Sequence, residues 1–345
     1  MERVISHSRP TLGQAEADAA ADAVLSGHVA CGDRTAGFER AVADAVGVAA
    51  AAATSSGTAA LYAALRALGV GPDDEVIVPS FVCTALLHAV WAAGAEPVVC
   101  DVGPDLNLSP DAARAGLTGR TAAIILPHIF GTPAPVEEFA ALGPPVVEDC
   151  AQAIGAEAGG AKCGSFGAVS TFSFYATKMM TTGEGGMFAS NRADLVGRAR
   201  DLIEYDKKSD AARRFNLKFN DVAAAIGLVQ IARLGDFIRR RREIAAAYDL
   251  ELSGLPGITL ARAAGSVYYR YAVEVDDADA LISGLRSRGI AAARPVDPPL
   301  HRVAGTAACP NAERAWARAV SLPIYPSLAD ADVRHVAAAV RAVMS

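Results

Sequence analysis

Lysine is scarce in this 345-residue sequence, which contains only 5 lysines beside 27 arginines. Hydrophobic residues make up 52% of the chain and charged residues 20%, a composition that excludes an intrinsically disordered protein. The net charge of −6 gives no electrostatic reason to expect nucleic acid, whose binding depends on clustered Lys and Arg. The densest basic run, Arg239 to Arg242, is interpreted as a solvated helix face or a subunit contact.

A long apolar run of the kind that crosses a membrane is also missing. The longest charge-free stretch, residues 45–65, is interrupted by Gly47 and by the polar segment 54–58, and much of the rest is alanine. We therefore expect a strand, a loop and a helix there rather than a membrane span. Because the first residues lack the basic-then-apolar layout of a secretion signal, we expect a cytoplasmic protein without a membrane partner.

Paired cysteines and the common metal and nucleotide motifs are absent as well. The six cysteines form no CxxC pair, and without a secretion signal they are expected to be free thiols: Cys31, Cys83, Cys100, Cys150, Cys163 and Cys309. There is no HExxH motif and no close Cys/His cluster, so no metal site is expected. The absence of a Walker lysine, and of a GxGxxG motif after a strand, disfavours a nucleoside triphosphate or a dinucleotide.

Apolar runs bounded by turn residues alternate with helix-length segments over the first part of the chain. Strands are expected at 75–79, 97–101, 122–126, 145–149, 168–174 and 186–190, with helices at 58–68, 82–93, 109–116 and 134–142. Strands separated by helices predict an α/β domain with a mostly parallel central sheet.

The pattern changes toward the end of the chain. A long helix is expected from about 220 to 251, then a strand at 267–273 and helices at 277–288 and 330–344. These elements predict a smaller C-terminal α+β domain. We expect a large domain at 1–245, which includes the N-terminal segment, and a small domain at 246–345.

Three polar features stand where ligands bind in such sheets, at the carboxyl ends of strands. Asp149 ends an apolar strand, and Lys178 follows another one. Segment 55–58, Ser-Ser-Gly-Thr, opens a helix whose backbone N–H groups favour an anion. Each has a structural alternative: an N-cap or buried salt bridge for Asp149, an exposed loop lysine for Lys178, and a plain helix cap for 55–58.

Together these features form a chemical set. A phosphate cradle, a carboxylate that keeps a ring nitrogen protonated and a lysine that forms a Schiff base are what pyridoxal 5′-phosphate requires. A semi-buried lysine is a competent amine nucleophile when its pKa is lowered. The sequence therefore favours this cofactor over the alternatives.

At this point the sequence resembles a known family, the DegT/DnrJ/EryC1/StrS sugar aminotransferases, which have the fold-type-I aminotransferase architecture. The resemblance covers nearly the whole chain. Its most specific motifs are Glu148–Ala156, the segment Ser173–Lys178 followed by Glu184-Gly185-Gly186, and Asn216 followed by Asp221–Gly227. Further matches lie at 8–13, 26–32, 56–61, 71–80 and 299–301.

The resemblance implies a role for individual residues. Lys178 is implied as the Schiff-base lysine and proton carrier, and Asp149 as the partner of the pyridine nitrogen. Gln152 is implied near the phenolic oxygen of the cofactor. The implied phosphate contacts are Gly57, Thr58, Ser173 and, from the neighbouring subunit of a homodimer with shared active sites, Asn216. His128 and His301 are implied to border the substrate.

One departure from the family concerns the position that usually carries an aromatic residue stacked on the cofactor ring. Here that position is Cys83, and Phe81 lies two residues earlier. Either Phe81 takes over the ring contact and borders the substrate, or the cofactor rests on the smaller and softer Cys83.

The resemblance implies an aminotransferase that moves an amino group from glutamate or glutamine to a keto-sugar, with a nucleotide-linked keto-deoxysugar as the favoured acceptor. A cyclitol ketone is the alternative acceptor. Family dehydratases replace the Schiff-base lysine with histidine, so Lys178 favours transamination, whereas aromatizing relatives keep the lysine and stay open. A non-enzymatic regulator is a remote alternative, because the sequence shows no basic helix-turn-helix unit.

Overall fold

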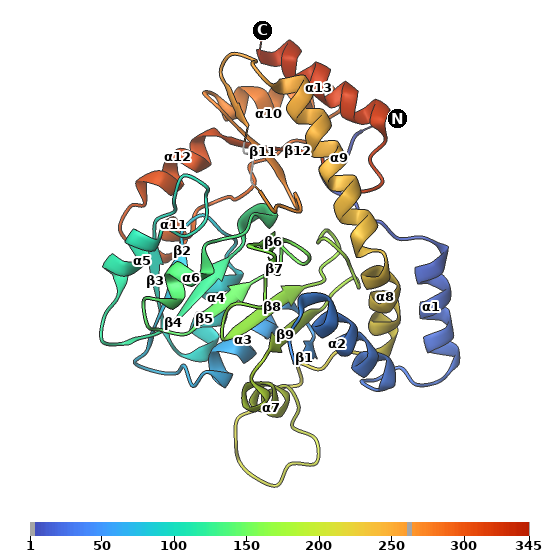
Figure 1. Ribbon diagram of the computed structural model, residues 1–345, viewed down its shortest axis with the longest axis vertical. Helices are drawn as coiled ribbons and strands as arrows, with labels where there is room; N and C mark the ends of the chain where they lie inside the picture. The colour runs from blue at the N-terminus through green and yellow to red at the C-terminus, as the bar shows by residue number, and fades with distance from the viewer. Residues whose placement is uncertain (1–3, 261–263, 345) are drawn as a thin grey trace.

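The computed structural model describes residues 4–260 and 264–344 and contains a seven-stranded central sheet (Figure 1). The strand order is β1-β9-β8-β5-β4-β2-β3. The strands are β1 (Ala50–Thr54), β2 (Glu75–Pro79), β3 (Glu96–Cys100), β4 (Thr121–Pro127), β5 (Val146–Asp149), β8 (Val169–Ser173) and β9 (Gly186–Ser190). Only β9 runs antiparallel to its neighbours. The α/β class and the mostly parallel sheet are therefore confirmed.

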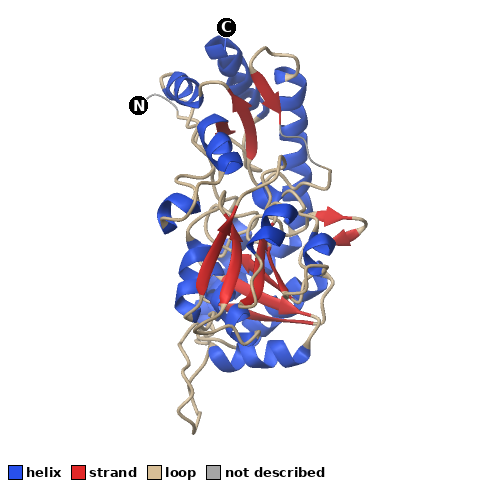
Figure 2. Cartoon of the chain, turned by 90° about the vertical axis from the view of Figure 1, so that its left-hand side faces the viewer, coloured by secondary structure: helices blue, strands red, loops and turns tan. Residues whose placement is uncertain are grey.

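Helices cover both faces of this sheet (Figure 2). They are α1 (Gln14–Leu25), α2 (Asp33–Val46), α3 (Gly57–Ala67), α4 (Ala85–Ala93), α5 (Pro110–Gly116), α6 (Val136–Ala140), α7 (Ala193–Leu202) and α8 (Asp221–Ala232), with the short 3₁₀ turn η1 (Ile129–Gly131). Side chains start several of them: Ser56 accepts a hydrogen bond from Ala59 N, and Ser109 accepts one from Ala112 N. A small hairpin, β6 (Glu157–Ala158) and β7 (Ala161–Lys162), lies outside the central sheet.

The stretch 45–65 folds as expected, into the end of α2, strand β1 and most of α3. Its alanines fit the narrow space between α3 and the sheet, where Ala60, Ala63 and Ala64 have no exposed surface. Among the described residues, the helices are all too short or too polar to span a bilayer. All six cysteines are free thiols.

The helix expected at 220–251 is two helices, because the chain bends at Arg233 between α8 and α9 (Leu234–Leu252). The interpretation of Arg239 to Arg242 as a solvated helix face or a subunit contact is wrong for Arg241, whereas Arg239 and Arg242 are exposed and Arg240 is partly exposed. Arg240 donates to the Leu328 carbonyl, Arg242 donates to the Ser266 carbonyl, and Arg241 is buried. The run also fastens α9 to the C-terminal part of the chain.

The C-terminal unit is a three-stranded antiparallel sheet packed against helices. It comprises β10 (Ile258–Leu260), β11 (Tyr271–Val275), β12 (Ala319–Leu322), α10 (Ala278–Arg286), α11 (Leu300–Ala304), α12 (Pro310–Arg318) and α13 (Asp330–Met344). The strand expected at 267–273 begins only at Tyr271, because Tyr268 has a left-handed backbone with φ of 51°. Residues 267–270 are therefore a loop.

This unit has its own hydrophobic core, which includes Tyr248, Leu281 and Val336. Ile5 belongs to the same core and forms a parallel bridge with Ile290. Since α9 contributes to both parts of the molecule, the division between residues 245 and 246 stays a prediction.

Candidate active site

The carboxyl ends of four parallel strands meet below the C-terminal unit. β5 ends at Asp149, β8 leads to Lys178, β2 leads to Ser80 and β4 leads to His128. The C-terminal unit is tied directly to these ends, since Leu300 N donates to the Ser80 carbonyl and Val267 N donates to the Gly131 carbonyl. Ligands bind at this edge in open α/β sheets.

Asp149 is nearly buried, with 7% of its surface exposed. Its Oδ1 accepts one hydrogen bond from Ala151 N at 3.0 Å, and its Oδ2 has no hydrogen-bond partner among the described residues. Burial raises the pKa of the Asp149 carboxyl, an effect that the Ala151 N–H and the Lys178 charge partly oppose. A buried carboxylate with an unused oxygen calls for a positively charged N–H partner, and a protonated pyridine nitrogen fits that requirement.

Lys178 is half-buried in the loop after β8. Its Nζ lies 5.0 Å from the centroid of the Tyr269 ring, and within the described part of the chain no carboxylate forms an ion pair with it. Three other lysines each pair with acidic side chains: Lys162 with Glu157, Lys208 with Asp201, and Lys218 with Asp206 and Glu204. Lys178 is thus kept apart from the anions that neutralise its counterparts.

The N-terminus of α3 fits the expected anion cradle. Ser56 caps the helix, and the first backbone N–H groups, those of Gly57 and Thr58, cannot be bonded within it. Gly57 packs tightly against β8, because a Cβ at Gly57 would lie 2.8 Å from Ser173 Cβ. The structure thus brings together Gly57, Thr58 and Ser173 as the resemblance implied, and a phosphate fits the chemistry of this end of the helix.

The side chain of Gln152 is oriented by a hydrogen bond from the backbone of Phe130. Its Oε1 accepts a hydrogen bond from Phe130 N at 2.7 Å, which turns the amide NH₂ group away from Phe130. An amide donor at this place fits a phenolate oxygen of the cofactor.

Cys83 and Phe81 differ sharply in position. Phe81 is fully buried in the main core, with its ring edge against Phe130 at 6.2 Å between centroids. The Cys83 side chain is exposed and lies close enough to Lys178 and Asp149 to feel their charges. Protein atoms around the Cys83 thiol desolvate it and raise its pKa, and the Lys178 charge partly opposes this shift. The geometry therefore places Cys83, and not Phe81, beside the proposed cofactor position.

His128 lies in the interior rather than in a cleft. The ring has no exposed surface, and Nε2 forms a hydrogen bond of 3.0 Å with Glu148 Oε2. Nδ1 accepts a hydrogen bond from Ala134 N, so the proton belongs on Nε2. The ligand atoms of His128, Glu148 and Cys150 lie within 4.8 Å of one another, a grouping that the sequence spacing did not reveal. Both ring nitrogens are engaged, so a substrate contact would require this network to open.

His301 is likewise engaged on both sides. Its Nδ1 lies 2.6 Å from Ser80 Oγ, and its Nε2 lies 2.8 Å from Glu313 Oε1. Since Ser80 follows β2 and His301 belongs to α11, this arrangement holds the C-terminal unit against the central sheet. The predicted substrate contacts of His128 and His301 gain no support from these positions.

Asn216 lies in the loop that joins α7 to α8, which projects from the body of the molecule (Figures 1 and 2). The side chain is exposed, and its Oδ1 has only a local contact with Lys218 N at 3.4 Å. The adjacent Leu217 accepts a hydrogen bond from Ser55 N, next to the start of α3. Asn216 therefore lies beside the anion cradle of its own chain but is open to a neighbour.

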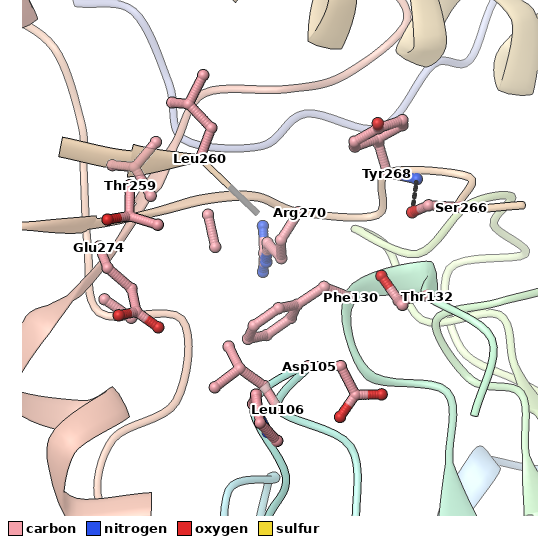
Figure 3. Close-up of a pocket in the computed structure, with 14 residues that line it drawn as sticks. Asp105, Leu106, Phe130, Thr132, Thr259, Leu260, Ser266, Tyr268, Arg270 and Glu274 are labelled. Atoms are coloured by element: carbon pink, nitrogen blue, oxygen red, sulfur yellow. Dashed lines mark hydrogen bonds between the residues drawn. The ribbon is translucent and has the colours of Figure 1, made fainter. Parts of the chain in front are cut away.

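Tyr269 and Arg270 are the residues that sequence reasoning missed. Both belong to the loop 267–270, whose alternating pattern resembles a strand and hides the contacts of Tyr269 with Lys178 and of Arg270 with Tyr269. Arg270 also faces a cavity of about 230 Å³ between the two parts of the molecule, together with Phe130, Asp105 and Glu274 (Figure 3).

Comparison with known proteins identifies the family. The model of the DegT/DnrJ/EryC1/StrS aminotransferase family matches residues 10–341. The dTDP-4-dehydro-2,3,6-trideoxy-D-glucose 4-aminotransferase of Saccharopolyspora spinosa is 37% identical, over 97% of this chain and 95% of that protein. The GDP-perosamine synthase of Caulobacter vibrioides is 35% identical, over 89% of each protein.

A solved aminotransferase structure also matches nearly the whole chain. The aminotransferase TlmJ from Streptoalloteichus hindustanus superposes with a TM-score of 0.94 at 38% identity, and the match covers 98% of both chains. The sheet, the strand-end carboxylate and the lysine described above are thus found within a fold shared with an aminotransferase. The chain belongs to the DegT/DnrJ/EryC1/StrS aminotransferase family and is a pyridoxal-phosphate-dependent aminotransferase.

Proposed function

We propose that this enzyme transfers an amino group from glutamate or glutamine to the keto group of a nucleotide-linked keto-deoxysugar. The observation that carries the proposal is the placement of Lys178 and Asp149 at neighbouring strand ends, with Lys178 unpaired to any described carboxylate. The choice of acceptor is supported by the two relatives above, one named for a dTDP-linked dehydro-sugar and the other for GDP-perosamine.

The bound cofactor supplies an electron sink for the substrate carbon while its ring nitrogen stays protonated. Asp149 would hold that proton through Oδ2, and its buried position would strengthen the interaction. Gln152 would donate from its amide to the phenolic oxygen, and Gly57, Thr58 and Ser173 would hold the phosphate. Cys83 would border the ring in place of an aromatic residue.

Lys178 is proposed as the proton carrier of both half-reactions. Its Nζ takes a proton from the donor carbon in the first half and returns one to the acceptor carbon in the second. Retention of lysine at this position favours transamination over the loss of a hydroxyl group.

The active site is proposed to be completed by a second copy of the chain. Tyr175, three residues before Lys178, is 48% exposed, and Phe215, next to Asn216, is 52% exposed. Large apolar side chains this open beside a site are typical of a surface that another subunit covers. In such a homodimer, Asn216 supplies a phosphate contact to the partner's site.

The acceptor is tested by loading the enzyme with pyridoxamine phosphate and offering a panel of dTDP-linked, GDP-linked and free keto-sugars and cyclitol ketones. The proposal expects the absorbance near 400 nm to return with a nucleotide-linked keto-sugar. If the absorbance returned only with a cyclitol ketone, the acceptor would be a cyclitol ketone instead. Loss of a hydroxyl group or formation of an aromatic product, without amine transfer, would overturn the proposal.

The shared site is tested by mixing two inactive variants, Lys178→Ala and Asn216→Ala. If each site uses Lys178 of one chain and Asn216 of the other, the mixed dimer contains one intact site, and activity returns on mixing. Mixtures that stay inactive although the subunits exchange would show that both residues act within one chain.

A further inference from the structure

The aromatic ring of Tyr269 lies against the Lys178 amine. The distance of 5.0 Å from Nζ to the ring centroid is within the range in which an ammonium is attracted to a ring face. Tyr269 is only 6% exposed, so water screens this contact little. The two residues come from different parts of the fold, since Lys178 follows β8 and Tyr269 precedes β11.

The position of the Tyr269 ring is fixed by the fold and not by Lys178. The buried guanidinium of Arg241, on α9, donates through Nη1 to the carbonyls of Tyr268 at 3.2 Å and Tyr269 at 3.3 Å. A third bond, to the Ile324 carbonyl at 3.1 Å, anchors Arg241 itself. These contacts hold the left-handed backbone of Tyr268, which an ordinary loop would relax.

The phenol group of Tyr269 is held by Arg270. Arg270 donates through Nη2 to Tyr269 Oη at 3.2 Å, and its guanidinium lies 4.6 Å from the same ring centroid. Arg270 in turn contacts Nδ1 of His7 at 3.3 Å, and no described carboxylate pairs with it. The ring therefore meets two cations, Lys178 and Arg270.

The charges around this pair act in opposite directions. Burial raises the pKa of Tyr269, but the charges of Lys178, Arg270 and Arg241 and a bond with Thr177 bring it below its ordinary value. On the other side, Lys178 faces Asp149 from β5 and Cys83 from the segment before α4. The Lys178 amine therefore lies between the Tyr269 ring on one side and the Asp149 carboxylate and the Cys83 thiol on the other.

We propose that Tyr269 is a positioning residue for Lys178: its ring face holds the amine at the sheet edge and stabilises the ammonium form between proton transfers. The proposal rests on the proton-carrying role proposed above for Lys178. A lysine side chain has four flexible bonds, so an amine released from the cofactor needs a surface that keeps it in reach of the reacting carbon. A carrier that both takes and returns a proton must also return to the same place between the two transfers, which the ring face provides.

The direct test measures the pKa of Lys178 in the enzyme freed of cofactor. The protein is labelled with acetic anhydride across a range of pH, and the extent of modification of the Lys178 peptide is read by mass spectrometry. Loss of the ring in Tyr269→Leu is expected to lower the Lys178 pKa by about 0.5 to 1 unit, whereas Tyr269→Phe, which keeps the ring, should change it by less than about 0.2 unit.

The matched control is Tyr268→Leu, which removes a ring from the neighbouring position of the same loop. Tyr268 lines the cavity with Arg270 (Figure 3), whereas the ring that lies against the Lys178 amine is that of Tyr269. Its variant should leave both the Lys178 pKa and kcat unchanged. Should Tyr269→Leu fail to fold, Tyr269→Met supplies a flexible apolar side chain without a ring face and is expected to give the same shift.

Turnover supplies a second readout. Tyr269→Leu should lower kcat by about tenfold or more with KM nearly constant, because the loss concerns the position of the amine rather than substrate binding. A Lys178 pKa within about 0.2 unit of wild type in Tyr269→Leu or Tyr269→Met, or an equal shift in Tyr268→Leu, would overturn the proposal. The labelling needs no turnover, so its outcome is separate from that of the acceptor panel, on which the proposed function depends.

Discussion

His128 and Glu148 form a hydrogen bond of 3.0 Å in which neither side chain has any exposed surface. Glu148 also accepts hydrogen bonds from the backbone N–H groups of Gly164, Phe166 and Gly167, so this pair joins the ends of β4 and β5 to the segment before β8. Glu148 directly precedes Asp149 on β5, so the pair holds the strand of Asp149 in place. Both residues therefore support the site from inside the protein.

This arrangement predicts the effect of His128→Ala. The variant leaves a cavity and a buried Glu148 without its side-chain partner, so the free energy of unfolding should fall by about 3 kcal/mol. Urea unfolding of the full-length enzyme measures this loss. A variant with wild-type stability and a raised KM for the acceptor would show instead that His128 binds substrate.

Asp149→Asn should remove the charge that keeps the ring nitrogen protonated. We expect kcat to fall by about 100-fold or more, because charge stabilisation in a buried site is a large part of catalysis. The matched control is Asp101→Asn at the end of β3, where the carboxylate accepts hydrogen bonds from Asn311 N and Ala312 N. The control should lose no more than about 1 kcal/mol of stability and keep its activity. Equal activity losses in the two variants would remove Asp149 from its proposed role.

Gly57→Ala should weaken cofactor binding. The added Cβ would lie 2.8 Å from Ser173 Cβ, so the start of α3 must move away from β8. The backbone N–H groups at the start of α3 would then no longer point at the phosphate position. Loss of one hydrogen bond to a charged phosphate predicts a Kd raised by roughly 10- to 100-fold, read from the absorbance of the bound cofactor.

Gly197→Ala in α7 is the control for this substitution. A Cβ there meets nothing within 4 Å, so the change should leave the Kd unaltered and stabilise the helix by about 0.5 to 1 kcal/mol. Wild-type cofactor affinity in Gly57→Ala would contradict the proposed phosphate cradle.

Cys83→Phe tests the unusual contact with the cofactor ring. Because the Cys83 side chain is exposed beside Lys178 and Asp149, an aromatic ring at this position should bind the cofactor as tightly as wild type or more tightly. Fluorescence or absorbance titration of the cofactor gives the comparison. A collapse of binding would assign Cys83 another role.

His7 predicts a specific pH dependence of stability. Its Nε2 lies 2.9 Å from Ser321 Oγ, and burial together with the Arg270 charge lowers the pKa of His7 to about 4. The folded protein therefore keeps His7 neutral, whereas the unfolded chain takes up a proton below about pH 6.5. The stabilisation is complete above pH 6.5 and is lost as the pH falls toward 4, with an upper limit of about 3 kcal/mol.

The measurement compares the unfolding free energy of wild type and His7→Gln at about pH 7.5, 5.5 and 4.5. Wild type should lose stability relative to the variant over this interval, because glutamine does not titrate. A difference between the two proteins that stays constant with pH would mean that His7 is not held neutral.

Much of the fold could be predicted because parallel strands buried on both faces are continuous apolar runs. β2 and β9 match their predicted ranges, and β5 and β8 differ only at their ends. Lys178 and Asp149 could be named as candidates for the same reason, since each stands at or after the end of such a run and lysine is rare in this chain.

The remaining features depend on contacts that sequence spacing does not show. Arg241 has the same local pattern as an exposed helix arginine, but its partners are carbonyls about 27 to 83 residues away. Tyr269 lies in a segment whose sequence alternates like a strand. In the structure, the left-handed backbone of Tyr268 and the buried Arg241 turn this segment toward Lys178. The two histidines matched family positions, yet whether each faces a cleft or the interior is decided by tertiary packing.

The central claim, that Lys178 carries the cofactor, is tested most directly by reducing the cofactor-loaded enzyme with borohydride and mapping the labelled peptide by mass spectrometry. The label is expected on the peptide that contains Lys178, and Lys178→Ala should take up none and lose turnover. Label on Lys162, Lys207, Lys208 or Lys218, or full turnover of Lys178→Ala, would contradict the account.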